Sequence, residues 1–305
     1  MHAPIPRRHL KLLDAAEAIR LDPDKVEAAF MARQLVQATL PHKNPGNVPL
    51  WARTNGNLTL TIQPGQGDGK LLGYPYGTIP RLLLFWMTTE AVKTKNRRLE
   101  LGNSLTAFMR ELGLNPDNGG TGAKRSDARR LRDQMQRLFQ ARISFNQKRE
   151  EKDRKGYAWL NMEIAPEGVL WWDEKQPDQT TLWDSWIQLG EKFYEAITAA
   201  PVPVDMRALK ALKRSPLALD LYAWATYTAF QTQKTGQSRS VSWEWLHEQM
   251  GGEYASIKDF GHKARLALRK VQAVYPDLGI QFEKGSVRVL PCHPAVTIKP
   301  KSSKK

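Results

Sequence analysis

The chain has 305 residues and a formal net charge of +15 at neutral pH, with 46 Lys and Arg residues against 31 Asp and Glu residues. Its length allows two ordinary domains, its 41% hydrophobic content excludes a disordered chain, and its positive charge favours nucleic acid or an anionic membrane surface as partner. No apolar segment approaches the roughly 20 residues of a membrane span and the N-terminus lacks a signal-peptide pattern, so we expect a cytoplasmic protein without a membrane partner.

The N-terminal part predicts two helices and a hairpin. Residues 9–20 and 24–40 have the spacing of amphipathic helices, and a proline follows the second. Residues 48–62 predict a β-hairpin, because two segments of strand character flank Asn55-Gly56, the strongest short-range hairpin signal. The glycine-rich segment 63–69 lacks the spacing of a Walker phosphate loop, so we interpret it as a surface loop.

The next elements have the order of a winged helix. The pattern predicts a buried helix, a short strand, a helix, a basic helix and two strands, over residues 80–92, 97–101, 104–112, 124–140, 141–147 and 156–164. Asn103 or Ser104 can cap the second helix, and Gly113 can end it. In a winged helix the second helix of the helix-turn-helix enters the major groove, and the hairpin, or wing, lies along the phosphates.

The basic helix from Lys124 to Gln140 has two distinct faces. Apolar residues at helical spacing, among them Leu131, Met135 and Leu138, predict a buried stripe. Arg129 and Arg132 share the opposite face with other polar residues. A solvated charged surface is the common explanation for such a face. The neighbouring elements and the repetition of the helix in the second half must decide between a solvated surface and a DNA contact.

The second half repeats these elements. An offset of 138 residues aligns Trp86 with Trp224 and places residues 104–113 on residues 242–251. An offset of 133 aligns the third helices, so that both the apolar stripe and the cationic face fall on residues of the same kind. Because a structural duplication would need to keep only the apolar stripe, we predict that both copies bind DNA. The second copy has a tighter turn and a shorter wing, and we expect its helix, residues 256–272, to read more of the bases.

The predicted DNA-binding residues lie on these helices and wings. On the first recognition helix they are Lys124, Arg125, Arg129, Arg130, Arg132 and Gln136, and on the first wing Lys148, Arg149, Lys152, Arg154 and Lys155. On the second recognition helix they are Lys258, His262, Lys263, Arg265 and Arg269. The second wing contributes Lys284 and Arg288, and the helix before the second copy contributes Lys213 and Arg214. Arginine is the natural reader of guanine edges, whereas wing cations suit phosphates.

We predict an α+β protein, mainly helical, with two tandem winged-helix domains and an N-terminal helical and β-hairpin extension. The predicted boundaries are 1–47 for the N-terminal helical extension, 48–170 for the first winged-helix domain, 171–184 for a linker, 185–296 for the second winged-helix domain and 297–305 for a basic tail.

Enzymatic and metal-binding signatures are missing from the sequence. The single cysteine, Cys292, cannot form an internal disulfide, and no Cys and His cluster has zinc-site spacing. The six histidines include neither a His-x-His pair nor an HExxH motif, which argues against a metal-dependent nickase or protease. Adjacent residues on an extended segment point apart, so Cys292 and His293 are a poor catalytic pair. We expect no cofactor, no metal and no enzymatic activity.

Particular segments resemble a known family. PYGTIPRLLLFWMTTEAVKTKNRRLELGNSLTAFMRELGL and RLRDQMQRLF, with PVPVDMRALKALKRSPLALDLYAWATY at residues 201–227, resemble the plasmid-encoded replication initiator proteins of the RepA type. The resemblance covers roughly residues 70–295 and extends to the wider iteron-binding initiator group, which has two tandem winged helices. It implies binding of monomers to direct repeats at a plasmid origin, opening of A·T-rich DNA and recruitment of the host initiator and replicative helicase. It also implies dimers, formed through the N-terminal winged domain, that are inactive for initiation and act in copy control.

Other functions are separable by experiment. A winged-helix transcription repressor, of its own gene or another operon, would bind inverted rather than direct repeats and would not melt DNA. A nickase would leave a cleavage product, and a packaging protein would bind without sequence preference. For an initiator, we expect the two basic helices to enter successive major grooves about 10 base pairs apart.

Overall fold

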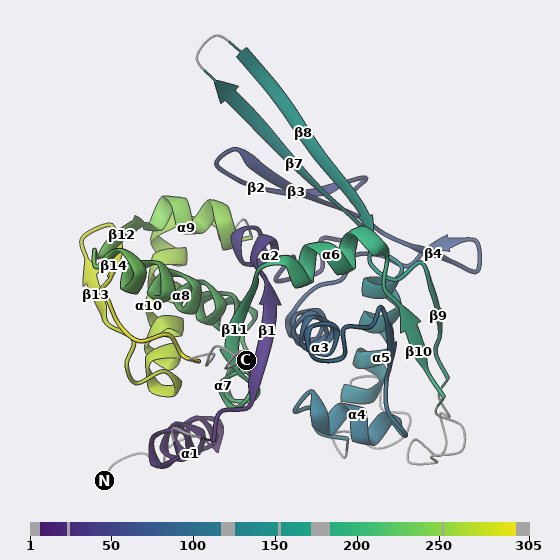
Figure 1. The fold of residues 1–305 in the computed structure, drawn as a ribbon, viewed down its shortest axis with the longest axis horizontal. Helices are drawn as coiled ribbons and strands as arrows, with labels where there is room; N and C mark the ends of the chain where they lie inside the picture. The colour runs from purple at the N-terminus through teal and green to yellow at the C-terminus, as the bar shows by residue number, and fades with distance from the viewer. Residues whose placement is uncertain are drawn as a thin grey trace, which may run out of the picture.

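The computed structural model describes residues 7–22, 25–116, 126–151, 154–171, 184–251 and 253–296. Helices and strands are both abundant, so the mixed α and β class is confirmed (Figure 1). The predicted contacts Lys124, Arg125 and Lys152, most of the predicted linker and the basic tail lie outside the described residues.

The N-terminal segment contains one of the two predicted helices. Helix α1 (Arg7–Leu21) matches the first, but the prediction of a helix over residues 24–40 is wrong, because the chain forms β1 (Ala28–Ala32) and the short α2 (Arg33–Gln37). Strand β1 pairs antiparallel with β11 (Pro201–Asp205), from Ala28 opposite Asp205 to Ala32 opposite Pro201. A partner 169 to 177 residues away, which helical periodicity does not report, therefore decides this conformation.

The predicted hairpin at residues 48–62 is confirmed as β2 (Trp51–Asn55) and β3 (Leu58–Gln63), with Gly56 in its turn at a φ of +55°. The segment interpreted as a surface loop enters a second, very short hairpin, β4 (Gln66–Gly67) and β5 (Lys70–Leu71).

The predicted helices and strands of the first half are all present. They are α3 (Thr78–Thr94), β6 (Arg98–Glu100), α4 (Leu105–Glu111), α5 (Asp127–Phe139), β7 (Arg142–Glu151) and β8 (Arg154–Glu163). Strands β7 and β8 form a long hairpin, the segment predicted as the first wing, which extends the N-terminal hairpin into a four-stranded sheet in the order β2-β3-β7-β8. Figure 1 shows this wing projecting from the body of the molecule.

The predicted linker lies between two strands of one sheet. Strand β9 (Glu167–Val169) precedes it, β10 (Trp186–Gln188) follows it, and the two pair in a sheet of order β6-β10-β9. Strand β10 therefore lies next to β6 of the first half, with β9 on its other side. Helix α6 (Glu191–Ala199) then leads to β11.

The second half repeats the order of the first. Its elements are α7 (Met206–Leu212), α8 (Pro216–Thr235), β12 (Arg239–Ser242), α9 (Trp243–Met250), α10 (Ile257–Val274), β13 (Ile280–Glu283) and β14 (Ser286–Val289). The turn predicted at Lys284-Gly285 is confirmed, with Gly285 at a φ of +81°. Here the strand between the helices joins the wing in one sheet, of order β12-β14-β13, whereas β6 of the first half pairs with β10.

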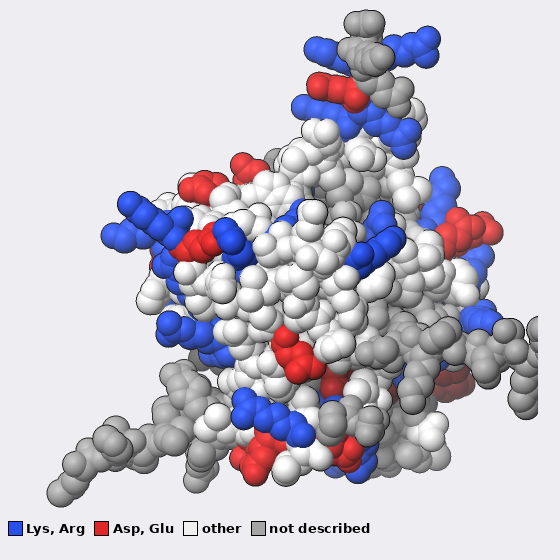
Figure 2. Space-filling model, turned by 60° about the vertical axis from the view of Figure 1, so that its left-hand side comes forward, with Lys and Arg blue, Asp and Glu red and all other residues white. Residues whose placement is uncertain are grey.

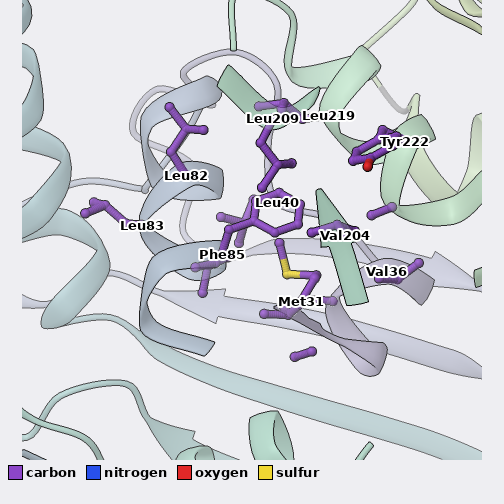
Figure 3. Packing of buried hydrophobic residues seen from close by; sticks show 14 of the residues in the cluster. Met31, Val36, Leu40, Leu82, Leu83, Phe85, Val204, Leu209, Leu219 and Tyr222 are labelled. Carbon is purple, nitrogen blue, oxygen red and sulfur yellow. The ribbon is translucent and has the colours of Figure 1, made fainter. Parts of the chain in front are cut away.

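The hydrophobic core runs through both halves without interruption. Strand β1 packs against α3 and β11 packs against α8, so the two strands fill the space between the halves. Figure 3 shows Met31 of β1 beside Phe85 of α3, with Val204 of β11 next to them. All three side chains are buried, and such burial stabilises by about 1.5–3 kcal/mol for each large apolar side chain.

A cluster of buried charged residues lies beside this core. Arg81 of α3 pairs with Asp220 of α8, and His42 contacts the same carboxylate. Glu253, in the turn between α9 and α10, accepts hydrogen bonds from the backbone N–H of His42 at 2.9 Å and from Arg53 at 3.1 Å. Burial lowers the pKa of Arg53 to about 10, so Arg53 remains charged at neutral pH. The turn before α10 is thereby tied to the N-terminal segment.

Candidate nucleic-acid interface

The third helix of each half begins in the same way. Ser126 precedes α5 and Ser256 precedes α10, and each hydroxyl accepts a hydrogen bond from the backbone N–H three residues later, at 3.2 and 3.1 Å. The preceding helices α4 and α9 are capped likewise by Ser104 and Ser242. A serine cap satisfies one of the free N–H groups of the first turn and fixes where the helix starts. The serine is thus repeated at both helix starts in each half.

The aligned apolar stripes of α5 and α10 are both buried. Leu131, Met135 and Leu138 of α5 are at most 1% exposed, and their equivalents Ala264, Leu268 and Val271 of α10 are fully buried. The opposite faces therefore point outward in both halves, because a helix that buries one stripe exposes the other side.

The outward face of α10 carries most of its predicted contacts. Lys258, His262, Lys263 and Arg269 are exposed. Arg265 is half-buried: its guanidinium lies 5.2 Å from the centre of the Trp243 ring, and its Nη2 donates to the backbone oxygen of Glu283 at 3.2 Å. Arg265 thus connects α10 to the second wing, which leaves fewer of its donors for a base.

The outward face of α5 is more heavily paired. Arg129 and Arg130 are exposed, and Arg130 makes an ion pair with Asp127 at 3.1 Å. Arg132 and Gln136 are half-buried. Sequence reasoning missed Arg137, which pairs with Asp133 at 3.0 Å and lies 5.6 Å from the centre of the Tyr76 ring. Since this contact involves a residue before α3, helical spacing alone gave no signal for it.

The first wing carries its cations near its tip. Figure 2 shows Lys and Arg side chains gathered there. They are the exposed residues Lys148, Arg149, Arg154 and Lys155. Glu150 lies opposite Lys155 in the strand register, so the tip is not purely cationic. In Figure 1 the tip stands well apart from α5, so the fold does not gather wing and helix into one patch.

The remaining predicted contacts lie in two places. On the second wing Lys284 is exposed, whereas Arg288 pairs with Glu283 at 2.8 Å. Lys213 and Arg214 follow α7, where burial, helped by the nearby charges of Lys11 and Arg214, lowers the pKa of Lys213.

The described residues contain no group of three or more His, Cys, Asp and Glu side chains that could hold a metal ion. Within the same residues, no helix combines the length and apolar character needed to cross a bilayer.

A repeated, serine-capped helix with an outward cationic face is the arrangement expected of a DNA-binding family, and the family model for plasmid-encoded RepA proteins matches residues 74–245, more than half of the chain. The chain belongs to the plasmid-encoded RepA family. RepA proteins of this family are plasmid replication initiators, which implies DNA binding. The resemblance inferred from the sequence is therefore confirmed.

Solved structures with a similar fold include two of RctB. A structure of its domains 2 and 3 has a TM-score of 0.50 and 12% identity, covering 83% of this chain and 94% of that one. Another structure of domains 2 and 3 has a TM-score of 0.49 and 12% identity, covering 85% and 96%. At this identity the likeness concerns the fold alone. No curated protein matches the chain.

Proposed function

We propose that this RepA-family chain initiates plasmid replication by binding duplex DNA through two tandem winged-helix modules, one from α3 to β8 and one from α8 to β14. The observation that carries this proposal is the repetition of a serine-capped third helix with a buried apolar stripe and an outward cationic face. A cationic face kept in both copies suits two successive contacts with one polyanion.

We assign different roles to the two modules, base reading mainly to the second and phosphate anchoring to the first. The second has the sheet expected of a winged helix, because β12 pairs with the wing strand β14, and its α10 presents Lys258, His262 and Arg269 to solvent. We assign it most of the base reading. The first has the longer wing, whose tip cations suit phosphates and so anchor the complex without reading sequence.

Binding to direct repeats at the origin would precede opening of A·T-rich DNA and recruitment of the host initiator and replicative helicase. Dimers formed through the first module would be inactive for initiation and would act in copy control. We assign the chain no catalytic step of its own, and no cofactor.

Footprinting on the DNA that flanks the gene tests this proposal. The purified protein should protect direct repeats of about 20 base pairs, each contacted in two major grooves about one helical turn apart. Protection of inverted repeats without strand opening would instead indicate a transcription repressor. Equal binding to random competitor DNA would overturn sequence-specific initiation altogether.

A further inference from the structure

A basic groove lies between the first recognition helix and the N-terminal helix. Its volume is about 750 Å³. Three separate elements provide its charged lining, namely α1 (Lys11, Asp14), the start of α5 (Asp127, Arg130) and the segment of α7 with the residues after it (Arg207, Lys210, Lys213, Arg214). Cations outnumber carboxylates in this lining by six to two. These three elements are far apart in the sequence. Their charged side chains come together only because the chain folds.

The groove is lined by residues of the first recognition helix and is related to the second only through the elements that pack against it. It includes residues of the first turn of α5, while α1 and α7, which form its other wall, both pack against α10. In Figure 1 α1, α7 and α4 lie in the lower part of the molecule, opposite the projecting wing. A duplex that contacts α5 and α10 in successive major grooves must pass its sugar-phosphate backbone between the two helices. Helices α1 and α7 lie in this region, because they face the start of α5 across the groove and pack against α10.

The cations of the groove differ in how they are used. Arg207 is held by Asp205, with Nη2 2.7 Å from the carboxylate, and Lys210 lies 3.7 Å from Glu27. Lys11, Lys213 and Arg214 form no salt bridge with another described residue. Lys213 is half-buried, and its pKa is lowered by burial and by the neighbouring charges of Lys11 and Arg214, although the carboxylate of Asp127 opposes this shift. An anion placed among these three would relieve their mutual repulsion.

We propose that this groove holds the sugar-phosphate backbone of the bound duplex between the two recognition helices, with Lys11, Lys213 and Arg214 as phosphate contacts. Helix α1 would then form one side of the DNA-binding interface, which gives the N-terminal segment a role in DNA binding. This inference rests on the proposed function, because the ligand of the groove is the duplex DNA that the proposed function supplies.

The test measures how the affinity for DNA depends on salt. The slope of log K against log salt is negative, and each lost phosphate contact should reduce its magnitude by about 0.9. We therefore expect the variants Lys11→Gln and Arg214→Gln, both at exposed side chains, to reduce the magnitude of that slope by about one each, on origin DNA and on random duplex alike. The matched control is Lys192→Gln, an exposed lysine of α6, which should leave the slope unchanged.

Ethylation interference then locates the contacts. With the parent protein, ethylating the phosphates between the two protected major grooves should block binding, and in the double variant Lys11→Gln/Arg214→Gln this block should be lost. An unchanged salt slope in a variant that unfolds at the parental temperature overturns the proposal. Loss of ethylation interference only at phosphates outside the stretch between the two protected major grooves overturns it as well. If the parent shows no preference for origin DNA, the proposed function fails, while the slope on random duplex still decides whether the groove binds backbone.

Discussion

Asp220 of α8 accepts two hydrogen bonds from the guanidinium of Arg81 on α3, from Nε to Oδ1 and from Nη2 to Oδ2, each at 2.8 Å. Both side chains are almost fully buried. The remaining donors of Arg81 reach the backbone oxygens of Leu40, Pro41 and Gly77. The first helices of the two repeats, α3 and α8, are therefore joined by a fully hydrogen-bonded ion pair, which holds the two repeats together.

Removing one partner of this pair should strongly destabilise the protein. In Asp220→Ala the guanidinium of Arg81 stays buried without its counter-charge, so we expect the free energy of unfolding to fall by about 3–5 kcal/mol. Urea unfolding followed by circular dichroism measures the change.

The control is an exposed ion pair on the first wing. Arg142 and Glu163 lie opposite each other on β7 and β8, 2.6 Å apart, with side chains 67% and 45% exposed. Glu163→Ala should change the free energy of unfolding by about 0–1 kcal/mol, because exposed pairs contribute little. Equal losses in the two variants would contradict the importance assigned to the buried pair.

His42 should make stability depend on pH. Its ring is buried among Asp220, Glu253, Arg81 and Arg53, and burial lowers its pKa below 6.5 although the hydrogen bond to Asp220 opposes this. The unfolded chain then binds a proton at a higher pH than the folded protein does, so stability falls as pH drops below about 6.5. The loss is at most about 1.4 kcal/mol per pH unit for one proton.

Thermal unfolding between pH 7.5 and 5.5 measures this dependence. His42→Gln keeps a donor for Asp220 but cannot titrate, so its melting temperature should vary less with pH than that of the parent. Asp220 does not contribute in this range. Burial opposes its ionisation, but the charge of Arg81 and the hydrogen bonds it accepts hold its pKa far below the usual 3.8, and its stabilisation is lost only below about pH 4. A parental profile that is flat from pH 7.5 to 5.5 would refute the assignment.

The sequence predicted elements that depend on local signals. Asn55-Gly56 located the first hairpin, Ser104 was a correct cap, and the apolar stripe of α5 is buried as expected. Strand β1 was missed because its pairing with β11 is a long-range contact between segments with no shared pattern. Arg81 and Asp220 each interrupt an apolar run, RLLLFWM and LALDLYAW, and a lone charge in such a run is a usable signal for a buried pair.

The candidate interface was predictable only in part. Helical spacing identified the outward cations of α10, but the half-burial of Arg265 depends on Trp243 and β13, which come from other elements. The basic groove depends on three segments that are separated by more than 60 residues from one another. Sequence periodicity describes one helix at a time and does not report such combinations.

The first wing should contribute phosphate attraction without sequence preference. Arg149→Ala and Lys155→Ala alter exposed side chains near the tip, so we expect each to reduce the magnitude of the negative slope of log K against log salt by about 0.9 and to leave stability unchanged. Because phosphate contacts carry no base information, origin and random DNA should lose affinity by the same factor. Filter binding at several salt concentrations measures both. A loss confined to origin DNA would mean that the wing reads sequence.

Two arginines of α10 should behave differently when replaced by alanine. Arg269 is exposed, so Arg269→Ala should leave stability within about 0.5 kcal/mol of the parent and weaken binding to the origin by about 1–3 kcal/mol, relaxing specificity at one base pair. Arg265→Ala removes the contact with Trp243 and the hydrogen bond to Glu283, so it should also lower the free energy of unfolding by about 1 kcal/mol.

Unfolding and binding must therefore be measured on both variants. Selection of preferred sites from a randomised repeat separates lost base reading from lost stability, because only the former changes the preferred sequence. If Arg265→Ala relaxes specificity at full stability, Arg265 is a base reader and its contact with the second wing is released when DNA binds. If Arg269→Ala binds the origin as tightly as the parent, the outward face of α10 does not enter the major groove of the DNA as assigned.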